Sequence, residues 1–319
     1  MQKIILTVGP SLGTKIPLHT IHKDLFIYRI NGAHGSVDDI KQMVLSLRQQ
    51  QKDIEILIDL PGNKIRTANI QTPITIKKGE EFSLKAQQFN YPDFIKLVKP
   101  GMKIYANDSC FLFIVKEVTD DAIIFLSQSD GVLLNGKGMH ARNLHHGIPF
   151  LFERDRALIE LCDTLDIAYV GASFVRRPED ILELKSLLNP KTKIIAKVET
   201  LEAVNQLYGI LQEVGFILID RGDLSTEIGI EKIPRFQKFI IEKAHHNGVK
   251  VFLATQILKN MEKNPVPTIA EIDDLYSILK MGIFGVQLSE ETAVGLYIKE
   301  CIEVLLMMHK EINAEQIIQ

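Results

Sequence analysis

The sequence predicts an α/β fold, a closed (β/α)8 barrel with a small all-β segment inserted after the third strand. Three observations predict it: eight short apolar runs, helical patterns between them, and one long gap in which the helical period disappears. The apolar runs are Ile4–Val8, Leu25–Ile30, Ile54–Leu60, Ile167–Val170, Lys193–Val198, Phe216–Asp220, Val249–Ala254 and Ile283–Leu288. Eight strands alternating with helices is the number in a closed TIM barrel, whose site lies at the strand C-termini. An open doubly wound sheet is the alternative.

Apolar residues recurring every three to four positions predict the helices. These patterns cover Val37–Gln51, Glu153–Thr164, Pro178–Leu188, Leu201–Val214, Ile233–Asn247, Thr268–Met281 and Ile298–Glu311. One such helix lies between the apolar runs 193–198 and 216–220, which makes a β-α-β unit. A unit of this length favours a parallel strand pair with a right-handed crossover.

The gap in the helical period, from about residue 68 to 146, predicts a separate β module. Short alternating runs replace the helices there, broken by glycine and proline turns. The runs are Phe82–Lys85, Lys103–Tyr105, Phe111–Val118 and Ala122–Ser127. We therefore expect a catalytic barrel domain of residues 1–67 and 147–319 and an inserted β-barrel-like lid domain of residues 68–146. Such an insertion either closes over the site or is a passive addition to the barrel.

The composition limits which kinds of binding partner and which cellular compartment we expect for this protein. The chain has 319 residues, 46% of them hydrophobic, with 37 basic against 40 acidic side chains. This balance gives no reason to expect nucleic acid or an anionic membrane as partner. Cys110, Cys162 and Cys301 form no CxxC pair, so they are expected to be core thiols in a reducing compartment. The N-terminus shows no signal-peptide pattern, so a cytoplasmic location is the default expectation.

Charged residues leave the ends of two neighbouring predicted strands. Lys197 lies near the end of the run 193–198 and Glu199 directly after it, and Arg221 and Asp223 follow the run 216–220. Because C-terminal ends of parallel strands open on one face, these groups should meet. They would form either a buried ion-pair network or a divalent metal site, since magnesium prefers carboxylate oxygens. Gly222 favours the metal site, because a missing side chain lets an anionic ligand approach backbone N–H groups.

Motifs at the strand ends extend this pattern along the chain. They are LTVGPS at 6–11, YRINGAHG at 28–35, IDLPGNKIRT at 58–67, GKGMH at 136–140, ASFVRRPEDI at 172–181, AKVETLEAV at 196–204, DRGDLSTEIG at 220–229, ATQIL at 254–258, NPVPTIAEIDD at 264–274 and QLSEETAVG at 287–295. In this order and spacing the series resembles the pyruvate kinase family over nearly the whole chain. The resemblance implies phosphoryl transfer between phosphoenolpyruvate and ADP, in which ATP and pyruvate are the other partners.

The resemblance also implies roles for individual residues. Glu199 and Asp223 would hold Mg²⁺ or Mn²⁺, and Lys197 would stabilise the moving phosphoryl group, as a loose transition state requires. Gly222, Asp223 and Thr255 would bind the substrate carboxylate, with Thr255 and Ser289 near the proton route. The nucleotide and phosphate side would contain Arg29, Asn31, His34 and Arg66, with Lys137 and Asp108 reaching in from the lid. Simpler roles stay open: ion pairs for the arginines, a turn for His34, solvent exposure for Lys137 and a helix cap for Thr255.

Several positions depart from the family pattern. Lys64 replaces a glutamate and Leu60 a threonine, while Ala33 stands where potassium-dependent members have a serine. A lysine ammonium near Asp59 would take the place of the monovalent cation, so the resemblance implies no K⁺ requirement. Asp220 adds a carboxylate, and Ser225 and Glu290 are further changes. The sequence leaves open whether turnover survives these changes, and which nucleotide or acceptor is used.

The sequence ends at Gln319, shortly after the last predicted barrel helix. Typical family members continue with a C-terminal regulatory domain. We therefore expect a short form without allostery of that kind, and a monomer or homodimer. Two other functions are compatible with the motifs. One is a magnesium-dependent lyase or aldolase acting on pyruvate or oxaloacetate enolates, and the other is a non-catalytic regulator that binds phosphoenolpyruvate or nucleotide.

Overall fold

The computed structural model describes residues 3–15, 24–107, 110–141, 144 and 147–318. The chain divides into two compact units. The first unit comprises Met1–Gly62, Leu151–Leu224 and Glu231–Gln319, and the second comprises Asn63–Phe150 and Ser225–Ile230.

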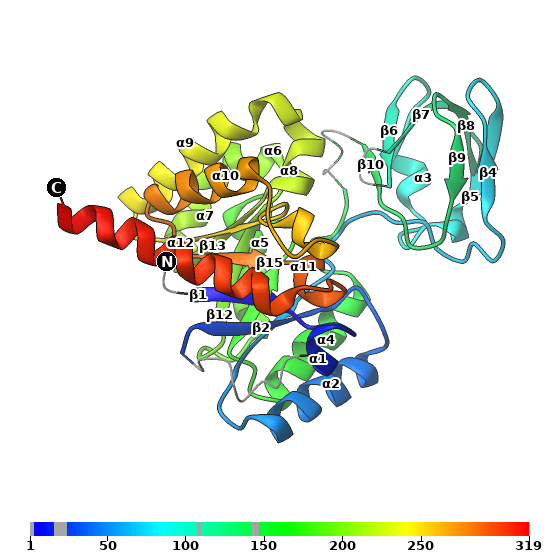
Figure 1. The fold of residues 1–319 in the computed structure, drawn as a ribbon. Helices are drawn as coiled ribbons and strands as arrows, with labels where there is room; N and C mark the ends of the chain where they lie inside the picture. The colour runs from blue at the N-terminus through cyan, green and yellow to red at the C-terminus, as the bar shows by residue number, and fades with distance from the viewer. Residues whose placement is uncertain (1–2, 16–23, 108–109, 142–143, 145–146, 319) are drawn as a thin grey trace. The chain divides into compact units, whose positions relative to one another are not determined.

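In the described part of the first unit, eight parallel strands close into a barrel (Figure 1). The strands are β1 (Lys3–Thr7), β2 (Phe26–Asn31), β3 (Glu55–Asp59), β11 (Tyr169–Ala172), β12 (Lys193–Val198), β13 (Phe216–Asp220), β14 (Lys250–Ala254) and β15 (Gly285–Leu288). Their order around the barrel is β1-β15-β14-β13-β12-β11-β3-β2, so each strand lies beside its sequence neighbour in the unit. The predicted TIM barrel is confirmed, and the open sheet is excluded.

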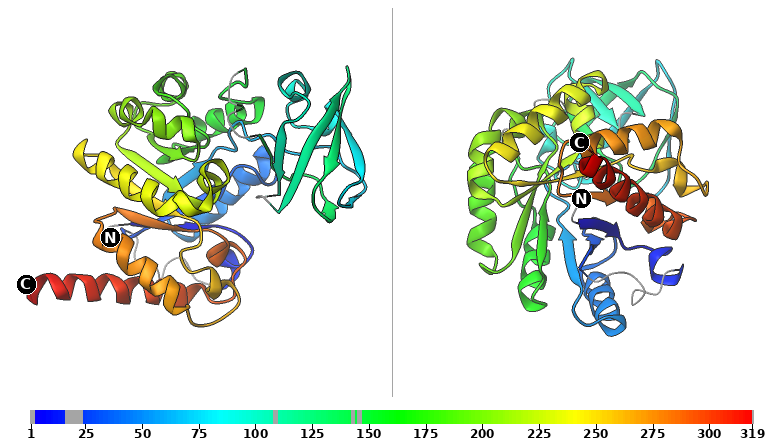
Figure 2. Two further views of the ribbon diagram at one scale, coloured as in Figure 1. Left: turned by 90° about the horizontal axis from the view of Figure 1, so that it is seen from above. Right: turned by 60° about the vertical axis from the view of Figure 1, so that its left-hand side comes forward.

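Helices follow the strands, and the longer ones cover the outside of the barrel (Figures 1 and 2). They are α1 (Leu12–Lys15), α2 (Val37–Gln50), α4 (Glu153–Thr164), α5 (Pro178–Leu187), α6 (Leu201–Asn205), α7 (Leu207–Glu213), α8 (Arg221–Ile228), α9 (Ile233–His246), α10 (Ile269–Lys280), α11 (Glu290–Ala293) and α12 (Ile298–Ile318), with short 3₁₀ helices η3 (Ile230–Lys232) and η4 (Lys259–Glu262). Helix α2 begins at a capping box in which Ser36 and Asp39 bond reciprocally.

Two helices differ from the sequence prediction. The single helix expected over 201–214 is divided into α6 and α7 at Gln206. The apolar period hides this break, because Val204 before it and Leu207 after it are both buried. Helix α8 was not predicted, since RGDLSTEI contains only two large apolar residues. It begins directly at the end of β13 and places Gly222 and Asp223 in its first turn.

The barrel interior is layered, and the layering positions the site. An apolar cluster fills the barrel, to which seven strands contribute Ile5, Ile27, Leu57, Tyr169, Ile195, Leu218 and Phe252. Side chains two residues further along a strand point to the same face. A second layer, two residues closer to the C-terminal ends of the same strands, therefore contains Thr7, Arg29, Asp59, Gly171, Lys197, Asp220 and Ala254. Gln287 joins this second layer because it pairs in register with Ala254. The C-terminal mouth of the barrel is therefore lined mainly by polar and charged groups.

The second unit is rich in β structure. Its described residues form a five-stranded antiparallel sheet of order β10-β6-β7-β8-β5 and a two-stranded sheet β4-β9. The strands are β4 (Ile74–Ile76), β5 (Glu81–Lys85), β6 (Lys103–Ala106), β7 (Phe111–Val118), β8 (Ala122–Ser127), β9 (Gly131–Leu133) and β10 (Met139–Ala141), with a 3₁₀ helix η2 (Ala86–Gln88). Phe82 packs against Phe113 and Phe125 between the strands. The unit also contains a short α-helix, α3 (Phe94–Leu97), so an all-β insertion is not confirmed in full.

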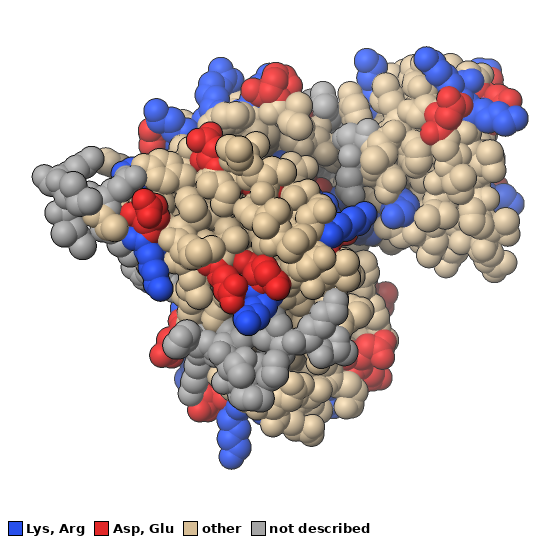
Figure 3. Space-filling view, in the orientation of Figure 1, with Lys and Arg blue, Asp and Glu red and all other residues tan. Residues whose placement is uncertain are grey.

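The structure bears on three expectations from composition, which concern surface charge, the burial of the cysteines and membrane contact. Positive and negative side chains are interspersed on the face shown in Figure 3, in keeping with the near-neutral balance. Cys162 and Cys301 are buried, as expected, but Cys110 is exposed. It lies in a turn before β7, where its N–H donates to Asn107, so its prediction as a core thiol is wrong. Among the described helices, none combines the length and apolar character needed to cross a membrane.

Candidate active site

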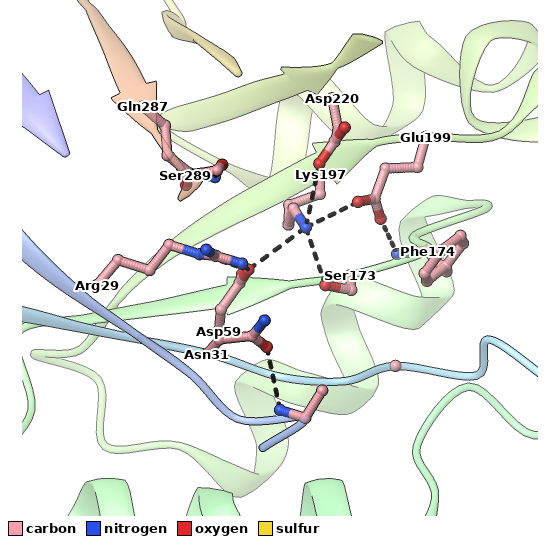
Figure 4. A network of polar contacts seen from close by, with 12 residues as sticks. Arg29, Asn31, Asp59, Ser173, Phe174, Lys197, Glu199, Asp220, Gln287 and Ser289 are labelled. Atoms are coloured by element: carbon pink, nitrogen blue, oxygen red, sulfur yellow. Dashed lines mark hydrogen bonds and ion pairs between the residues drawn. The ribbon is translucent and has the colours of Figure 1, made fainter. Parts of the chain in front are cut away.

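Lys197 lies at the centre of the polar layer, and its ammonium faces three carboxylates (Figure 4). Its Nζ is 2.7 Å from Glu199 Oε1, 3.4 Å from Asp59 Oδ2 and 3.7 Å from Asp220 Oδ2. It also lies 3.3 Å from the hydroxyl of Ser173. Burial disfavours the charged lysine, but the three carboxylates outweigh burial and raise its pKa. Lys197, which is itself only 5% exposed to solvent, is therefore a charged cation inside the barrel.

Arg29 forms the second buried cation of the layer. Its Nε and Nη2 donate to Asp59 Oδ2 at 2.9 and 2.7 Å, and its Nη1 donates to Thr7 Oγ1 at 3.0 Å. Gly171 makes this arrangement possible, since a Cβ there would lie 2.0 Å from Asp59 Oδ1. Burial of Asp59 opposes ionisation, but the charges of Lys197 and Arg29 outweigh it and lower the pKa of Asp59. In the structure Arg29 is held in a buried ion pair.

Glu199 follows β12 and is fully buried. Its Oε2 accepts a hydrogen bond of 2.6 Å from the N–H of Phe174, whose φ of 53° is in the left-handed region. Its Oε1 meets Lys197 at ion-pair distance but accepts no well-aligned hydrogen bond from the described residues. Burial raises the pKa of Glu199, and Asp223 and Asp220 add to this despite the opposing charge of Lys197. This oxygen would be stabilised by a further cation.

Asp220 and Thr255 join the ends of β13 and β14. The Thr255 hydroxyl donates to Asp220 Oδ1 at 2.6 Å, and the N–H of Gly222 reaches the same oxygen at 3.2 Å. A Cβ on Gly222 would lie 3.0 Å from Thr255 Cγ2, so glycine permits this close approach. A hydroxyl has one proton to donate. Thr255 therefore offers an acceptor oxygen to any ligand while its proton is held by Asp220.

The backbone at Thr255 is strained and is held by Arg221. Thr255 and Gln256 have φ values of 76° and 56°, which side-chain-bearing residues rarely adopt. Arg221 donates to the carbonyl of Thr255 from Nε at 3.0 Å and Nη2 at 2.8 Å, and to the carbonyl of Gln256 at 2.9 Å. Its Nη1 pairs with Asp274 at 2.6 Å. This clamp fixes Thr255 in its unusual conformation.

Three carboxylates of the site are suited to a divalent cation. One oxygen from each of Glu199, Asp220 and Asp223 lies within 4.8 Å of the others. Carboxylate oxygens are the ligands that Mg²⁺ and Mn²⁺ take in proteins. Asp59 and these three carboxylates also outnumber the two buried cations, Arg29 and Lys197, by two negative charges. The donor type, the charge and the poorly satisfied Glu199 Oε1 fit a divalent metal.

Other predicted residues of the barrel lie around this centre. Ser289 is the N-cap residue directly before α11, and its N–H donates to Glu291. Its hydroxyl receives a long contact of 3.5 Å from Gln287 Nε2. Asn31 ends β2, and its side chain accepts from the N–H of Ala33 at 3.1 Å. His34 is exposed in the turn that follows, where its N–H donates to the carbonyl of Asn31.

The remaining predicted residues belong to the second unit. Arg66 pairs with Gly138 in an isolated bridge. The carbonyl of Lys137 accepts from the N–H of Thr67, and the N–H of Lys137 donates to the Thr67 hydroxyl. Lys64 runs beside Gly138, since a Cβ there would lie 2.8 Å from Lys64 Cε. The structure thus brings Lys64, Arg66 and Lys137 together within this unit. Asp108 lies outside the described residues.

Fold and site together define a class of protein: a (β/α)8 barrel whose mouth holds buried cations beside a carboxylate group suited to a divalent metal. The chain matches the family model for the pyruvate kinase barrel domain over residues 1–302. It is 32% identical to the pyruvate kinase of Thermotoga maritima over 97% of this chain and 70% of that protein. It is 30% identical to that of Borreliella burgdorferi (98% and 68%) and 32% identical to that of Thermococcus litoralis (97% and 69%). The chain belongs to the pyruvate kinase family.

Sequence reasoning missed three residues that shape this site. Ser173 contacts Lys197, Gln287 lies in the polar layer, and Arg221 clamps the turn at Thr255. Gln287 had a signal, because it is the one polar residue inside the apolar run Ile283–Leu288, where side chains alternate between the two faces of a strand. The role of Arg221 had no signal in the sequence, because its partners are backbone carbonyls at the end of another strand.

Proposed function

We propose that this chain catalyses phosphoryl transfer between phosphoenolpyruvate and ADP with a divalent metal ion. Membership of the pyruvate kinase family supports this activity. The observation that carries it is the placement of the Lys197 ammonium among Asp59, Glu199 and Asp220, at the C-terminal mouth of the barrel. A buried, fixed cation there can stabilise charge that spreads over a transferring phosphoryl group.

The two cations of the barrel would act on the phosphoryl group. Lys197 would stabilise the charge on the phosphoryl oxygens during transfer. Arg29 is already oriented by Asp59 and Thr7, so its guanidinium would bind phosphate without first being ordered. Water exclusion at this buried layer strengthens both interactions.

The metal would be held by Glu199 and Asp223, whose oxygens lie in the carboxylate group described above. When bound, Mg²⁺ or Mn²⁺ would neutralise the negative charge of the substrates and orient them. The backbone N–H groups of Gly222 and Asp223, at the start of α8, would bind the substrate carboxylate. For Thr255 to donate to that carboxylate, its hydroxyl must release Asp220 Oδ1. Thr255 and Ser289 would then lie near the route by which a proton reaches the enolate.

The second unit would supply the nucleotide side of the reaction. We propose that residues 68–146 form a lid domain on a barrel of residues 1–67 and 147–319. Arg66 and Lys137, neighbours across the bridge at Gly138, would bind phosphate oxygens of the nucleotide. Asn31 and His34 would contribute from the barrel. Family members that match this chain match it through the inserted segment as well. An enolate lyase has no reason to keep a nucleotide-binding module, so this favours the kinase.

We further propose that the enzyme needs no potassium ion, because Lys64 would supply the positive charge near Asp59. Activity is expected to be unchanged when sodium or tetramethylammonium is the only monovalent cation. A Lys64→Glu variant should become potassium-dependent. A strict potassium requirement in the wild type would contradict the proposal. A cytoplasmic location stays a prediction from the sequence.

Phosphorus NMR provides a direct test of the reaction. The protein is mixed with phosphoenolpyruvate, ADP and Mg²⁺, and the phosphoenolpyruvate resonance is expected to decay while the three resonances of ATP appear. Asp223→Ala should leave the spectrum at background. Release of inorganic phosphate without ATP would indicate hydrolysis. Unchanged spectra in all samples would favour the regulator instead.

A further inference from the structure

Asp220 is a third carboxylate at an inward-facing position beside Lys197, in addition to Asp59 and Glu199. It lies two residues after Leu218, in the polar layer that also contains Lys197 and Asp59. Its side chain is 15% exposed, so it lies at the mouth of the barrel rather than on the outer surface. A buried or half-buried carboxylate that adds to an existing negative charge is unfavourable unless a cation balances it.

The two oxygens of Asp220 have different surroundings. Oδ1 accepts from the Thr255 hydroxyl at 2.6 Å and from the N–H of Gly222 at 3.2 Å, so protein donors fix the orientation of the carboxylate. Oδ2 faces Lys197 at 3.7 Å, beyond hydrogen-bond distance. Lys197 is itself closer to Glu199 and Asp59. Oδ2 therefore keeps acceptor capacity toward the centre of the site.

The same centre contains a carboxylate oxygen, Glu199 Oε1, whose cationic neighbour Lys197 is shared with Asp59 and Asp220. Glu199 Oε1 is buried and accepts no well-aligned hydrogen bond from the residues described. It lies in the group in which oxygens of Glu199, Asp220 and Asp223 are within 4.8 Å of one another. One ion placed among these three would compensate Glu199 and the additional charge of Asp220 together.

We propose that Asp220 is a third protein carboxylate for the divalent cation, in addition to Glu199 and Asp223. A site with three carboxylates binds the ion before any substrate arrives, because the protein alone supplies the charge and the ligands. The inference rests on the proposed function for the identity of the ion. It assigns a ligand role to one residue of this chain, Asp220, beyond the two carboxylates proposed above.

The test is a titration with Mn²⁺ in the absence of phosphoenolpyruvate and nucleotide, following free Mn²⁺ by electron paramagnetic resonance. Asp220→Asn is the informative variant, because an amide oxygen keeps the hydrogen bond from Thr255 while the charge is lost. We expect its Kd for Mn²⁺ to rise about tenfold or more, the effect typical of losing a group that supports a metal. Asp220→Ala should show the same rise and covers the case in which the asparagine variant does not fold. Glu55→Gln, at the opposite end of the barrel, is the matched control and should bind as the wild type does.

Two results would overturn the inference: a wild-type protein that does not bind Mn²⁺ without substrates, or folded Asp220 variants whose Kd stays within about twofold of the wild type. Thermal unfolding of metal-free samples shows which variants are folded. The outcome is separable from the proposed function. A protein that binds Mn²⁺ through Asp220 but forms no ATP would refute the kinase activity alone. An active kinase whose Kd for Mn²⁺ is unchanged by substitution of Asp220 would refute this inference alone.

Discussion

Arg29 donates two hydrogen bonds to a single oxygen of Asp59, from Nε at 2.9 Å and from Nη2 at 2.7 Å, and Lys197 lies 3.4 Å from the same oxygen. One carboxylate oxygen therefore compensates two buried cations. Removing its charge leaves both cations without that partner. We expect Asp59→Asn to lower the free energy of unfolding by about 3–5 kcal/mol, the cost of breaking a buried pair on one side. Urea denaturation measures this, with Asp163→Asn on the surface as control. A loss below about 1 kcal/mol would show that Asp59 is not the main compensating charge.

The same pair predicts a dependence of stability on pH. The pKa of Asp59 is lowered in the folded protein, because Lys197 and Arg29 outweigh the effect of burial. The unfolded state then binds protons more readily, so the contribution of Asp59 is fully present above the unfolded pKa of about 3.9 and is lost as pH falls through the folded value. The difference in unfolding free energy between wild type and Asp59→Asn should therefore be constant near neutrality and shrink below about pH 4. A difference that grows on acidification would contradict this sign.

The clamp formed by Arg221 should matter for both stability and activity. Arg221→Met removes charged hydrogen bonds to the carbonyls of Thr255 and Gln256, which lie in a strained conformation. We expect a loss of about 1.5–3 kcal/mol in stability. The turn at Thr255 should also relax. The KM for phosphoenolpyruvate should therefore rise more in Arg221→Met than in a control variant. Arg235→Met, an exposed arginine on α9, is that control. Equal effects of the two substitutions would indicate that the clamp does not hold the turn.

Gln287 offers a prediction of increased stability. Its side chain is 2% exposed, and its Oε1 has no hydrogen-bond partner among the described residues. Gln287→Met keeps the length of the side chain and removes the unsatisfied acceptor. The free energy of unfolding of the ligand-free protein is expected to rise by about 1–3 kcal/mol. Gln212→Met, where the amide is exposed and bonded to Asn247, should change it little. Destabilisation by Gln287→Met would mean that the amide is satisfied in solution.

Much of the fold was predictable because strand and helix periods are local properties of the sequence. The eight barrel strands were located within one or two residues at most ends, and α4 was predicted at its observed bounds. The division between α6 and α7 at Gln206 could not be predicted, because buried apolar residues continue on one face across it. Helix α8 could not be predicted, because its sequence contains few apolar residues.

The site was predictable where a motif lies at a strand end, as for Lys197 and Glu199. The β-α-β unit predicts that Glu199 and Asp223 meet on one face of the sheet, and one oxygen of each lies within 4.8 Å of the other. The bond between Asp220 and Thr255 and the clamp by Arg221 join residues about 35 positions apart. Such contacts depend on the barrel register and on positive φ values, which the sequence does not display. The roles of Lys64, Arg66 and Lys137 stay predictions.

We propose that Lys197, the buried lysine near the end of β12, stabilises the phosphoryl group during its transfer. Pyruvate formation from phosphoenolpyruvate, ADP and Mg²⁺, followed in a coupled assay, tests it most directly. Lys197→Met is compared with Lys193→Met, in which the lysine at the N-terminal end of the same strand is replaced. We predict a loss of about 10³-fold or more in kcat for Lys197→Met, corresponding to about 4 kcal/mol of transition-state stabilisation, and near wild-type turnover for Lys193→Met. Equal turnover by wild type and a folded Lys197→Met variant would contradict the account.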